Sequence, residues 1–331
     1  MIRFLVFADL HYKKGMYAVK VQHLEKILDR AREEGVDLVL HAGDFSNDYH
    51  GSGELVKKYL SNEYHLSVYG VYGNHELESN HNSMELVTPL LTNDTRVIWG
   101  TADGKLGDGS IGYYYFEKKG YRFICLDTNY SYREEDGRWE HNHTASWGAP
   151  AGNRCPDSLG PEQLQWLEGV LLDGAQRGMA CILVSHAGFM QAWRHSPDTQ
   201  AVQTLIRKAN EKKPGTVLLC INGHYHRDNV CVLDDVCYFD VNGASSDWIE
   251  KRHHAYPDEL HERVAKLHHL IVNESPLYAI VELDGATISI KGSETKMLHG
   301  VTYRDATGSD GYDRCGRPWK PYIDSNKITL G

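Results

Sequence analysis

The sequence has no apolar run that approaches the roughly 18 residues needed to cross a membrane. Its N-terminal stretch, MIRFLVFADLHY, contains only a short apolar run from Phe4 to Ala8, which Asp9 interrupts. No small-residue cleavage site follows this run, as a secretory signal peptide would require. We therefore interpret the stretch as a first β-strand that is retained in the mature protein, and we expect no membrane partner.

An excess of positive charge and a cysteine framework are also missing. The chain has 35 Lys and Arg residues against 45 Asp and Glu residues, a net charge of −10, which disfavours binding to long nucleic acids. Its seven cysteines lack framework spacing, and Cys125, Cys181 and Cys220 lie in strand-like apolar runs. These features indicate a reduced, cytoplasmic setting. A phosphorylated substrate would need a local source of positive charge, such as a metal ion.

Apolar runs alternate with helical patterns over the first part of the chain. The predicted strands cover residues 2–8, 36–40, 66–71, 122–126, 181–184 and 217–221. Apolar residues at helical spacing predict helices over residues 19–33, 161–172 and 200–210. This alternation indicates an α/β layered domain.

The pattern changes after residue 228. Residues 229–233, 237–241, 277–283 and 287–291 are predicted to form antiparallel strands, with turns at Asp234-Asp235 and Asp284-Gly285. The predicted fold class is therefore α/β, with two sheets packed as a β-sandwich and flanked by helices. We expect a catalytic domain over residues 1–291, with surface insertions at 131–158 and 250–275, and a C-terminal extension over residues 292–331 that packs on it.

The stretch INGHYHRDNV, at residues 221–230, places two histidines just after an apolar run. In an extended chain their side chains would point to the same face and could share one target, although an exposed loop would also explain them. The other strand ends favour a shared target, because each presents Asp, Asn or His, often beside glycine. The five segments are Asp9-Leu10-His11, His41-Ala42-Gly43-Asp44, Gly73-Asn74-His75-Glu76, Ser185-His186-Ala187-Gly188 and Gly223-His224-Tyr225-His226.

Ligands of open α/β sheets bind outside the carboxyl ends of the strands, so we expect these five segments to meet at one rim. Together they offer two carboxylates, one amide and four imidazoles, from Asp9, His11, Asp44, Asn74, His186, His224 and His226. Mixed nitrogen and oxygen donors without thiolate suit Mn, Fe or Zn. Seven ligands are too many for one tetrahedral ion and suit two ions, ~3.5–4 Å apart, that share one ligand.

In this order, the motifs Asp-x-His, Gly-Asp, Gly-Asn-His-Asp/Glu, His and Gly-His-x-His resemble those of the calcineurin-like metallophosphoesterase superfamily, whose fold is a β-sandwich flanked by helices. The resemblance implies a first metal site made by Asp9, His11 and His226. It implies a second site made by Asn74, His186 and His224, with Asp44 bridging both. It also implies that His75 is a catalytic residue that stands off the metals, near the leaving oxygen.

A looser resemblance is to the branch that holds purple-acid-phosphatase-like enzymes, cyclic-nucleotide phosphodiesterases and ADP-ribose-type diphosphatases. It is carried by YYYFEKKGYRFICLDTN at residues 113–129 and LGPEQLQWLEGVL at residues 159–171. The additional tyrosine ligand of purple acid phosphatases is not evident, which argues against a purple iron site.

From the resemblance we expect hydrolysis of a small phosphorylated substrate by a metal-bridging hydroxide, with His75 protonating or hydrogen-bonding the leaving oxygen. His41, Tyr225 and Arg227 are further candidates for substrate contacts. Arg227 has the geometry to hold a phosphate bidentately, but a surface salt bridge explains it equally well. The ligand set does not separate a phosphatase from a phosphodiesterase, and nothing in the sequence indicates the oligomeric state.

Three alternatives remain open. A nucleotide diphosphatase would use the same ligands and needs room for a second substituent, which the aromatic insertion offers. A nuclease shares the ligand pattern but usually carries an additional DNA-binding region, which is not found, and the acidic balance disfavours it. A non-catalytic metal-binding scaffold is argued against by the full ligand set and by His75.

Adjacent histidine pairs also occur outside the five segments. His253-His254 and His268-His269 lie in polar stretches of the chain. We expect both pairs to be solvated.

Overall fold

The structure is a computed structural model of the chain. It describes residues 1–12, 18–47, 64–77, 91–100, 112–133, 137–141, 157–190, 196–249, 252–309, 311 and 319–331. Most of the predicted insertion at 131–158, namely residues 134–136 and 142–156, lies outside the described residues.

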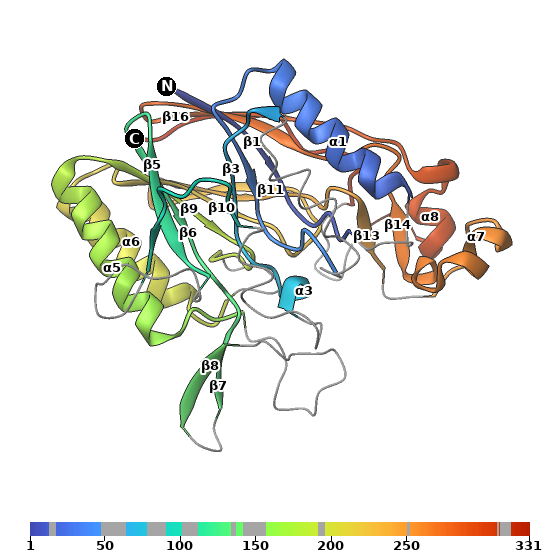
Figure 1. The fold of residues 1–331 in the computed structure, drawn as a ribbon, viewed down its shortest axis with the longest axis horizontal. Helices are drawn as coiled ribbons and strands as arrows, with labels where there is room; N and C mark the ends of the chain where they lie inside the picture. Colours follow the sequence, from blue (N-terminus) through green and yellow to red (C-terminus); the bar gives the residue numbers. More distant parts are fainter. Residues whose placement is uncertain are drawn as a thin grey trace.

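Two mixed β-sheets pack face to face (Figure 1). The first sheet has six strands in the order β17-β16-β15-β1-β2-β3. These strands are β1 (Ile2–Phe7), β2 (Leu38–His41), β3 (Val68–Gly70), β15 (Ala279–Asp284), β16 (Thr287–Gly292) and β17 (Asn326–Thr329). β1, β2 and β3 run parallel, whereas β15, β16 and β17 extend the sheet by antiparallel pairing.

The second sheet has seven strands in the order β11-β12-β10-β9-β6-β5-β4. These strands are β4 (Ile98–Trp99), β5 (Tyr114–Lys118), β6 (Tyr121–Cys125), β9 (Ala180–Ser185), β10 (Val217–Asn222), β11 (Asn229–Leu233) and β12 (Val236–Asp240). Its central strands β6, β9, β10 and β12 are parallel. Two small two-stranded antiparallel sheets complete the strands, β7 (Tyr130–Arg133) with β8 (Arg138–His141) and β13 (Ser246–Trp248) with β14 (Leu270–Val272).

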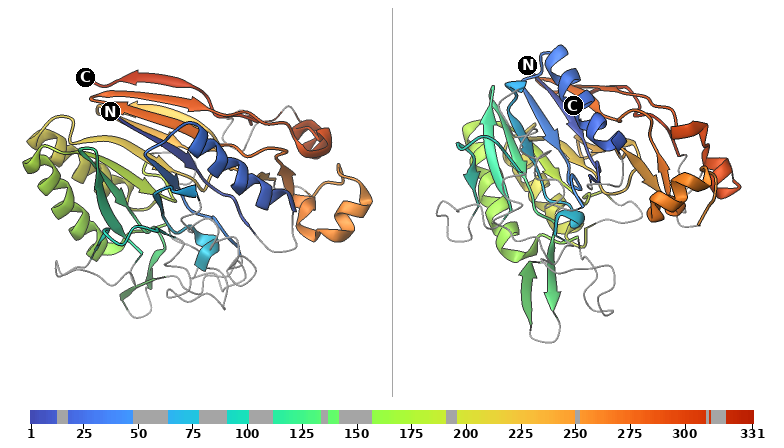
Figure 2. Two further views of the ribbon diagram at one scale, coloured as in Figure 1. Left: turned by 45° about the horizontal axis from the view of Figure 1, so that its top comes forward. Right: turned by 45° about the vertical axis from the view of Figure 1, so that its right-hand side comes forward.

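Helices cover the outer faces of the sandwich, as Figure 2 shows. α1 (Ala18–Glu33) packs Leu24, Ile27 and Leu28 against the first sheet. α5 (Gly160–Arg177) and α6 (Thr199–Lys212) lie side by side on the second sheet. The short elements are α3 (Asn74–Leu77), α7 (Asp258–Arg263), α8 (Tyr303–Thr307) and the 3-10 turns η3 (Ala265–His269) and η4 (Leu298–Gly300). Among the described residues, none of the helices has the length and apolar character that crossing a bilayer requires.

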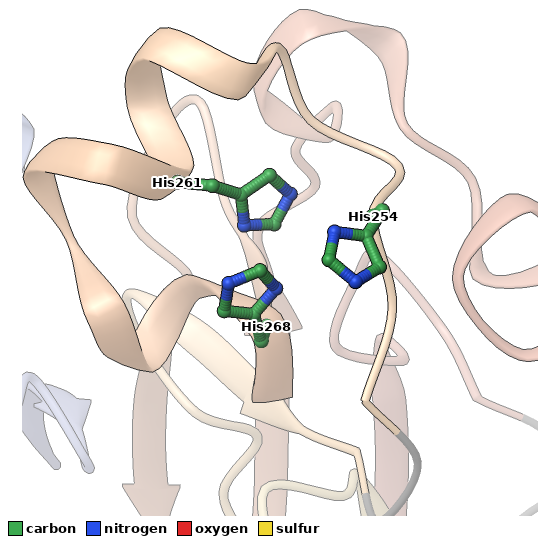
Figure 3. A group of neighbouring side chains, drawn as sticks. All are labelled: His254, His261 and His268. Atoms are coloured by element: carbon green, nitrogen blue, oxygen red, sulfur yellow. The ribbon is translucent and has the colours of Figure 1, made fainter.

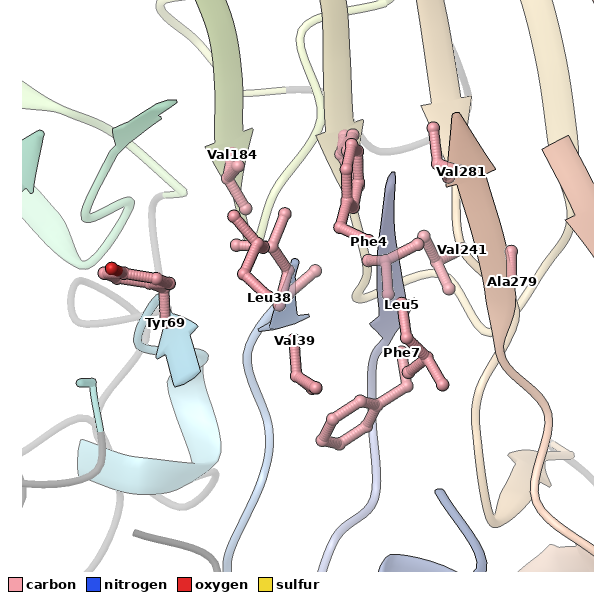
Figure 4. Close-up of a cluster of buried hydrophobic side chains, with 14 of the residues drawn as sticks. Phe4, Leu5, Phe7, Leu38, Val39, Tyr69, Val184, Val241, Ala279 and Val281 are labelled. Carbon is pink, nitrogen blue, oxygen red and sulfur yellow. The ribbon is translucent and has the colours of Figure 1, made fainter. Parts of the chain in front are cut away.

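The main core fills the space between the sheets (Figure 4). The ring of Phe4 meets that of Phe123 edge-to-face at a centroid distance of 5.5 Å, which joins β1 to β6. The run from Phe4 to Phe7 is buried without alternation, because one face of β1 meets the second sheet and the other meets α1. Full burial of each such side chain stabilises the fold by roughly 1.5–3 kcal/mol.

The α/β sandwich predicted from the sequence is confirmed, with strand boundaries within one or two residues at most positions. The turn at Asp234-Asp235 has φ values of 51° and 57°, as a two-residue hairpin turn requires. One pairing differs from the expectation, because β12 pairs with β11 in antiparallel fashion but with β10 in parallel. The sequence also gave no signal for β17, which adds an edge strand to the first sheet.

Candidate metal centre

Five parallel strands end at one rim, where the two sheets come together. Asp9 and His11 follow β1, Asp44 follows β2 and Asn74 follows β3. His186 follows β9, and His224 and His226 follow β10. Backbone hydrogen bonds join the segments, from Asp9 N–H to the Gly43 carbonyl at 3.0 Å and from His11 N–H to the Asp44 carbonyl at 2.8 Å. The side chains of the predicted ligands therefore gather in one buried place.

Asp9, His11 and His226 form the first group, with ligand atoms within 4.8 Å of one another. Asp9 Oδ1 lies 3.2 Å from His226 Nε2 and 3.8 Å from His11 Nε2. The two Nε2 atoms face each other at 3.0 Å. All three side chains are almost completely buried.

Asp44, His186 and His224 form the second group. Asp44 Oδ2 lies 3.2 Å from His186 Nε2, and His186 Nε2 lies 3.1 Å from His224 Nδ1. Asn74, the first residue of α3, is buried, with 4% of its surface exposed, and the backbone N–H of the next residue, His75, donates to Asp44 Oδ1.

Asp44 is the side chain that joins the two groups. Its Oδ2 lies 3.7 Å from His11 Nε2 of the first group as well as 3.2 Å from His186 of the second. Burial would raise the pKa of Asp44, but the imidazoles of His186 and His75 hold it well below its ordinary value. A carboxylate that stays charged between two sets of imidazoles has the position and charge of a bridging ligand.

The second ring nitrogens of three histidines fix which nitrogen faces the centre. His11 Nδ1 donates to Asn47 Oδ1 at 2.9 Å, His186 Nδ1 donates to the Ala42 carbonyl at 2.8 Å, and His226 Nδ1 donates to the Ser246 carbonyl at 2.5 Å. Each neutral ring therefore presents an Nε2 lone pair to the centre. Lone pairs of His11 and His226 that face each other at 3.0 Å repel unless a cation or a proton lies between them. This donor set fits metal ions.

Backbone strain is concentrated at the same place. Five of the seven predicted ligands have left-handed φ values, which are 55° at Asp9, 49° at His11, 50° at Asp44, 72° at His224 and 50° at His226. Such conformations cost of order 1–3 kcal/mol each and persist only where the surrounding structure enforces them. The buried strands before each ligand and the close neighbours after it provide that enforcement.

Glycines allow the segments to approach closely. A Cβ atom at Gly73 would lie 2.1 Å from Asp44 Oδ1, and one at Gly223 would lie 2.8 Å from Asp9 Oδ2 and 2.7 Å from the Cβ of Ala8. A side chain at either position would displace a carboxylate of the centre.

Glu76, for which the sequence indicated no role, holds the backbone of the loops that carry the centre. Its carboxylate accepts backbone N–H groups from Asp44 at 3.0 Å, Ser46 at 2.8 Å and Gly73 at 2.6 Å. Burial and the nearby Asp44 carboxylate raise the pKa of Glu76 to about 7. Glu76 thereby ties the loop after β2 to the loop after β3, a connection that only the folded chain reveals.

His75 lies at the edge of the centre and is more exposed than the buried ligands Asp9 and His186, at 8%. Its backbone N–H donates to Asp44 Oδ1 at 2.8 Å, and its Nε2 lies 3.9 Å from Asp44 Oδ2. Its ring is parallel to that of Trp248, with centroids 6.3 Å apart and an interplanar angle of 3°. His75 thus faces the centre on one side and an aromatic wall on the other.

The three candidates for substrate contacts lie in different surroundings. His41 is completely buried and lies next to the rings of Phe7 and Phe45. Arg227 is also buried, and its guanidinium pairs with Asp247 Oδ2 at 2.6 Å. Tyr225 is partly exposed and accepts the Gly188 N–H at 3.2 Å.

Comparison with known proteins adds family and fold. The family model described as calcineurin-like phosphoesterase matches residues 2–228. A dimetal phosphatase from Danio rerio is similar in structure, with a TM-score of 0.58 and 19% identity over 90% of this chain and 98% of that chain. GAP50, the anchor in the inner membrane complex of Plasmodium, has a TM-score of 0.50 and 13% identity over 100% of this chain and 89% of that chain. At these identities the two structures establish the fold alone. Curated proteins give no match to this chain.

Proposed function

The chain belongs to the calcineurin-like phosphoesterase family of metal-dependent phosphoric ester hydrolases, and from this premise we propose that it cleaves small phosphate esters at two cations that share Asp44. The observation that carries the proposal is the position of Asp44 Oδ2 between His11 Nε2 and His186 Nε2. It is supported by the Nε2 atoms of His11, His186 and His226, whose rings are fixed by bonds from their other nitrogens.

We assign one cation to Asp9, His11 and His226 and the other to Asn74, His186 and His224, with Asp44 as ligand to both. Nitrogen and oxygen donors without thiolate suit Mn, Fe or Zn. When bound, the two cations would supply Lewis-acid stabilisation of charge on the phosphoryl oxygens and would lower the pKa of bound water. The ligand side chains of the protein would position the cations, and the buried residues around them exclude bulk water from the centre.

His75 is proposed to donate a proton or a hydrogen bond to the leaving oxygen. Its main-chain bond to Asp44 fixes its backbone next to the centre, and its ring lies parallel to that of Trp248. A positioned general acid of this kind contributes roughly 10²–10⁴ in rate. A Tyr225 contact with the substrate is also proposed, because Tyr225 is partly exposed beside His224, at a ring distance of 5.3 Å.

We further propose that residues 1–291 form the catalytic domain and residues 292–331 its extension. The packing of the extension on the domain is supported by β17, which pairs with β16 at the edge of the first sheet. A reducing, cytoplasmic setting is proposed from Cys125, Cys181 and Cys220, which are buried thiols in central strands.

The test is an assay panel on protein stripped of metal and reloaded with Mn, Fe, Zn or Mg. The substrates are an aryl phosphate monoester, a bis-aryl diester and a long duplex DNA. We expect one of the small esters to be cleaved only after two equivalents of cation are restored. Full activity in stripped protein, or no cleavage of either small ester with any cation, would contradict the proposal. Preferential, salt-sensitive cleavage of DNA would instead favour a nuclease.

A further inference from the structure

A second group of histidines lies outside the centre at the strand ends. His254 precedes α7, His261 lies on α7 and His268 lies on η3. Figure 3 shows their three rings turned toward a common space. One nitrogen from each ring lies within 4.8 Å of the other two. The expectation that the histidine pairs of this region are solvated is wrong for His253 and His268, which are buried, with exposed fractions of 4% and 9%.

His261 is the feature that calls for an explanation. It is 7% exposed, and both of its ring nitrogens are buried without a hydrogen-bond partner among the residues that the structure describes. A buried imidazole normally has a partner for each nitrogen, because losing water without gaining a bond is unfavourable. The ring faces His268, at a centroid distance of 4.1 Å, and His254, at 5.4 Å. Within the described part of the chain, its surroundings thus offer two imidazoles and no hydrogen-bond partner for either ring nitrogen.

His268 is oriented in the way that metal-bound histidines are oriented. Its Nδ1 donates to the His253 carbonyl at 2.9 Å, so a neutral ring presents its Nε2 lone pair. The neighbouring His253 provides a contrast, because both of its nitrogens are used within the fold. His253 Nε2 donates to the Leu270 carbonyl at 2.9 Å, and its Nδ1 accepts the Ala255 N–H at 3.2 Å.

The group brings three imidazoles into a compact space. Burial and the adjacent imidazoles of His268 and His254 lower the pKa of His261, while Asp258 opposes this effect. Of the residues that the structure describes, no carboxylate or thiol belongs to the group. Three imidazole nitrogens are ligands for a borderline divalent cation, and they suit it better than calcium or magnesium, which prefer oxygen.

We propose that His254, His261 and His268 bind one borderline divalent cation, with zinc as the reference ion. Three protein ligands leave a fourth position for water. The cation would hold α7 against η3, and η3 leads directly into β14. β14 pairs with β13, and Trp248 of β13 pairs with Leu270. The cation would therefore stabilise the position of β13, whose Trp248 ring lies parallel to the ring of His75.

The experiment measures tightly bound Zn²⁺ per chain by equilibrium dialysis and elemental analysis. His254→Ala is the first variant, because His254 is exposed and its loss leaves no buried cavity. His268→Ala is the second. His269→Ala is the matched control, since His269 is the exposed neighbour of His268 but is outside the group. All three variants are made in the intact chain and again in Asp44→Asn. The second background separates Zn²⁺ bound by the three histidines from metal bound at the centre at the strand ends, so that the two proposals can fail independently.

We expect His254→Ala and His268→Ala to bind one equivalent of Zn²⁺ less than the parent chain in both backgrounds, while His269→Ala binds the same amount. Loss of a ligand is expected to weaken Zn²⁺ binding by more than the roughly 10–100-fold that loss of a hydrogen-bond partner of a ligand costs. Co²⁺ in place of Zn²⁺ should give visible absorption in Asp44→Asn that disappears in the double variant with His254→Ala. Equal Zn²⁺ content in His254→Ala and the parent chain would overturn the proposal.

Discussion

The centre at the strand ends and the histidine group beside α7 both gather imidazoles within reach of a cation, but they differ in charge and in support. The first contains two buried carboxylates, Asp9 and Asp44, among its histidines. The second contains three imidazoles, and no carboxylate among the described residues belongs to it. Carboxylates add negative charge that offsets two multivalent cations held close together, whereas neutral imidazoles suit a single divalent ion.

The two sites also differ in the elements that carry their ligands. The ligands of the first centre follow buried parallel strands and take left-handed φ values, 50° at Asp44 and 55° at Asp9 among them. The ligands of the second lie on and around a helix of six residues and a 3-10 turn. The two packed sheets enforce these left-handed conformations, and we expect a centre on such a rigid scaffold to keep its geometry during a reaction. A cation held by short elements instead contributes to their folding.

The largest effect is expected from Asp44→Asn. The substitution keeps the shape but removes the charge that both groups face, at 3.7 Å from His11 Nε2 and 3.2 Å from His186 Nε2. We expect both cations of the centre and the activity to be lost together, with turnover lower by about 10³-fold or more, since metal stabilisation is worth several kcal/mol. Elemental analysis and the ester assay measure this. An active variant with full metal content would show that Asp44 does not bridge.

His75→Ala separates catalysis from metal binding within the first centre. Turnover should fall roughly 10²–10⁴-fold because the leaving oxygen loses its donor. Metal content should equal that of the parent chain. His11, Asp44 and His75 also have ligand atoms within 4.8 Å of one another, so loss of metal in this variant would make His75 a ligand.

Gly73→Ala tests the close packing behind Asp44. The new Cβ would lie 2.1 Å from Asp44 Oδ1 and 2.4 Å from its backbone nitrogen. We expect metal affinity to fall roughly 10–100-fold, as when an outer-shell partner of a ligand is lost. Gly169→Ala is the control, because Gly169 lies in α5 and a Cβ there meets nothing within 4 Å. Similar affinities in the two variants would argue against packing control of Asp44.

The smallest effect is expected at Asp94. The negative charge of this carboxylate is stabilised by hydrogen-bond donors of the protein and not by metal ions. Arg96 donates to Asp94 Oδ1 at 2.8 Å and Tyr69 Oη donates to Oδ2 at 2.7 Å. The Arg96 bonds hold the pKa of Asp94 below its ordinary value, although burial opposes them. Its stabilisation is therefore present above the unfolded pKa, near ~3.9, and is lost as the pH falls through the lower folded value.

Asp94→Asn should accordingly lower the free energy of unfolding by about 1–2 kcal/mol at pH 7. The difference from the parent chain should narrow below pH ~4, as the parent carboxyl becomes protonated. Urea unfolding midpoints from neutral to acid pH give this difference. A difference that stays constant down to pH ~2 would show that the charge of Asp94 contributes nothing.

The apolar runs in the sequence were sufficient to predict the strands and to place the candidate ligands at their carboxyl ends. Each of Asp9, Asp44 and His186 follows a buried strand, and parallel strands end at one rim whatever the loops contain. What the sequence could not reveal depends on contacts between distant segments. The three backbone bonds to Glu76 and the pairing of Arg227 with Asp247 exist only once the loops are placed.

The histidines beside α7 show the same limit. Polar neighbours in the sequence predict solvation for His253 and His268, yet the packing of α7, η3 and β14 buries both. His254, His261 and His268 are spaced seven positions apart, which is compatible with many arrangements, so the spacing alone does not indicate a site.

The central claim is tested most directly by anomalous diffraction from crystals of the metal-loaded protein, recorded at the absorption edges of the bound metals. We expect two anomalous peaks roughly 3.5–4 Å apart at the strand ends. One should contact Asp9, His11 and His226, the other His186 and His224, with Asp44 touching both. A single peak away from Asp44, or none at the strand ends, would contradict it.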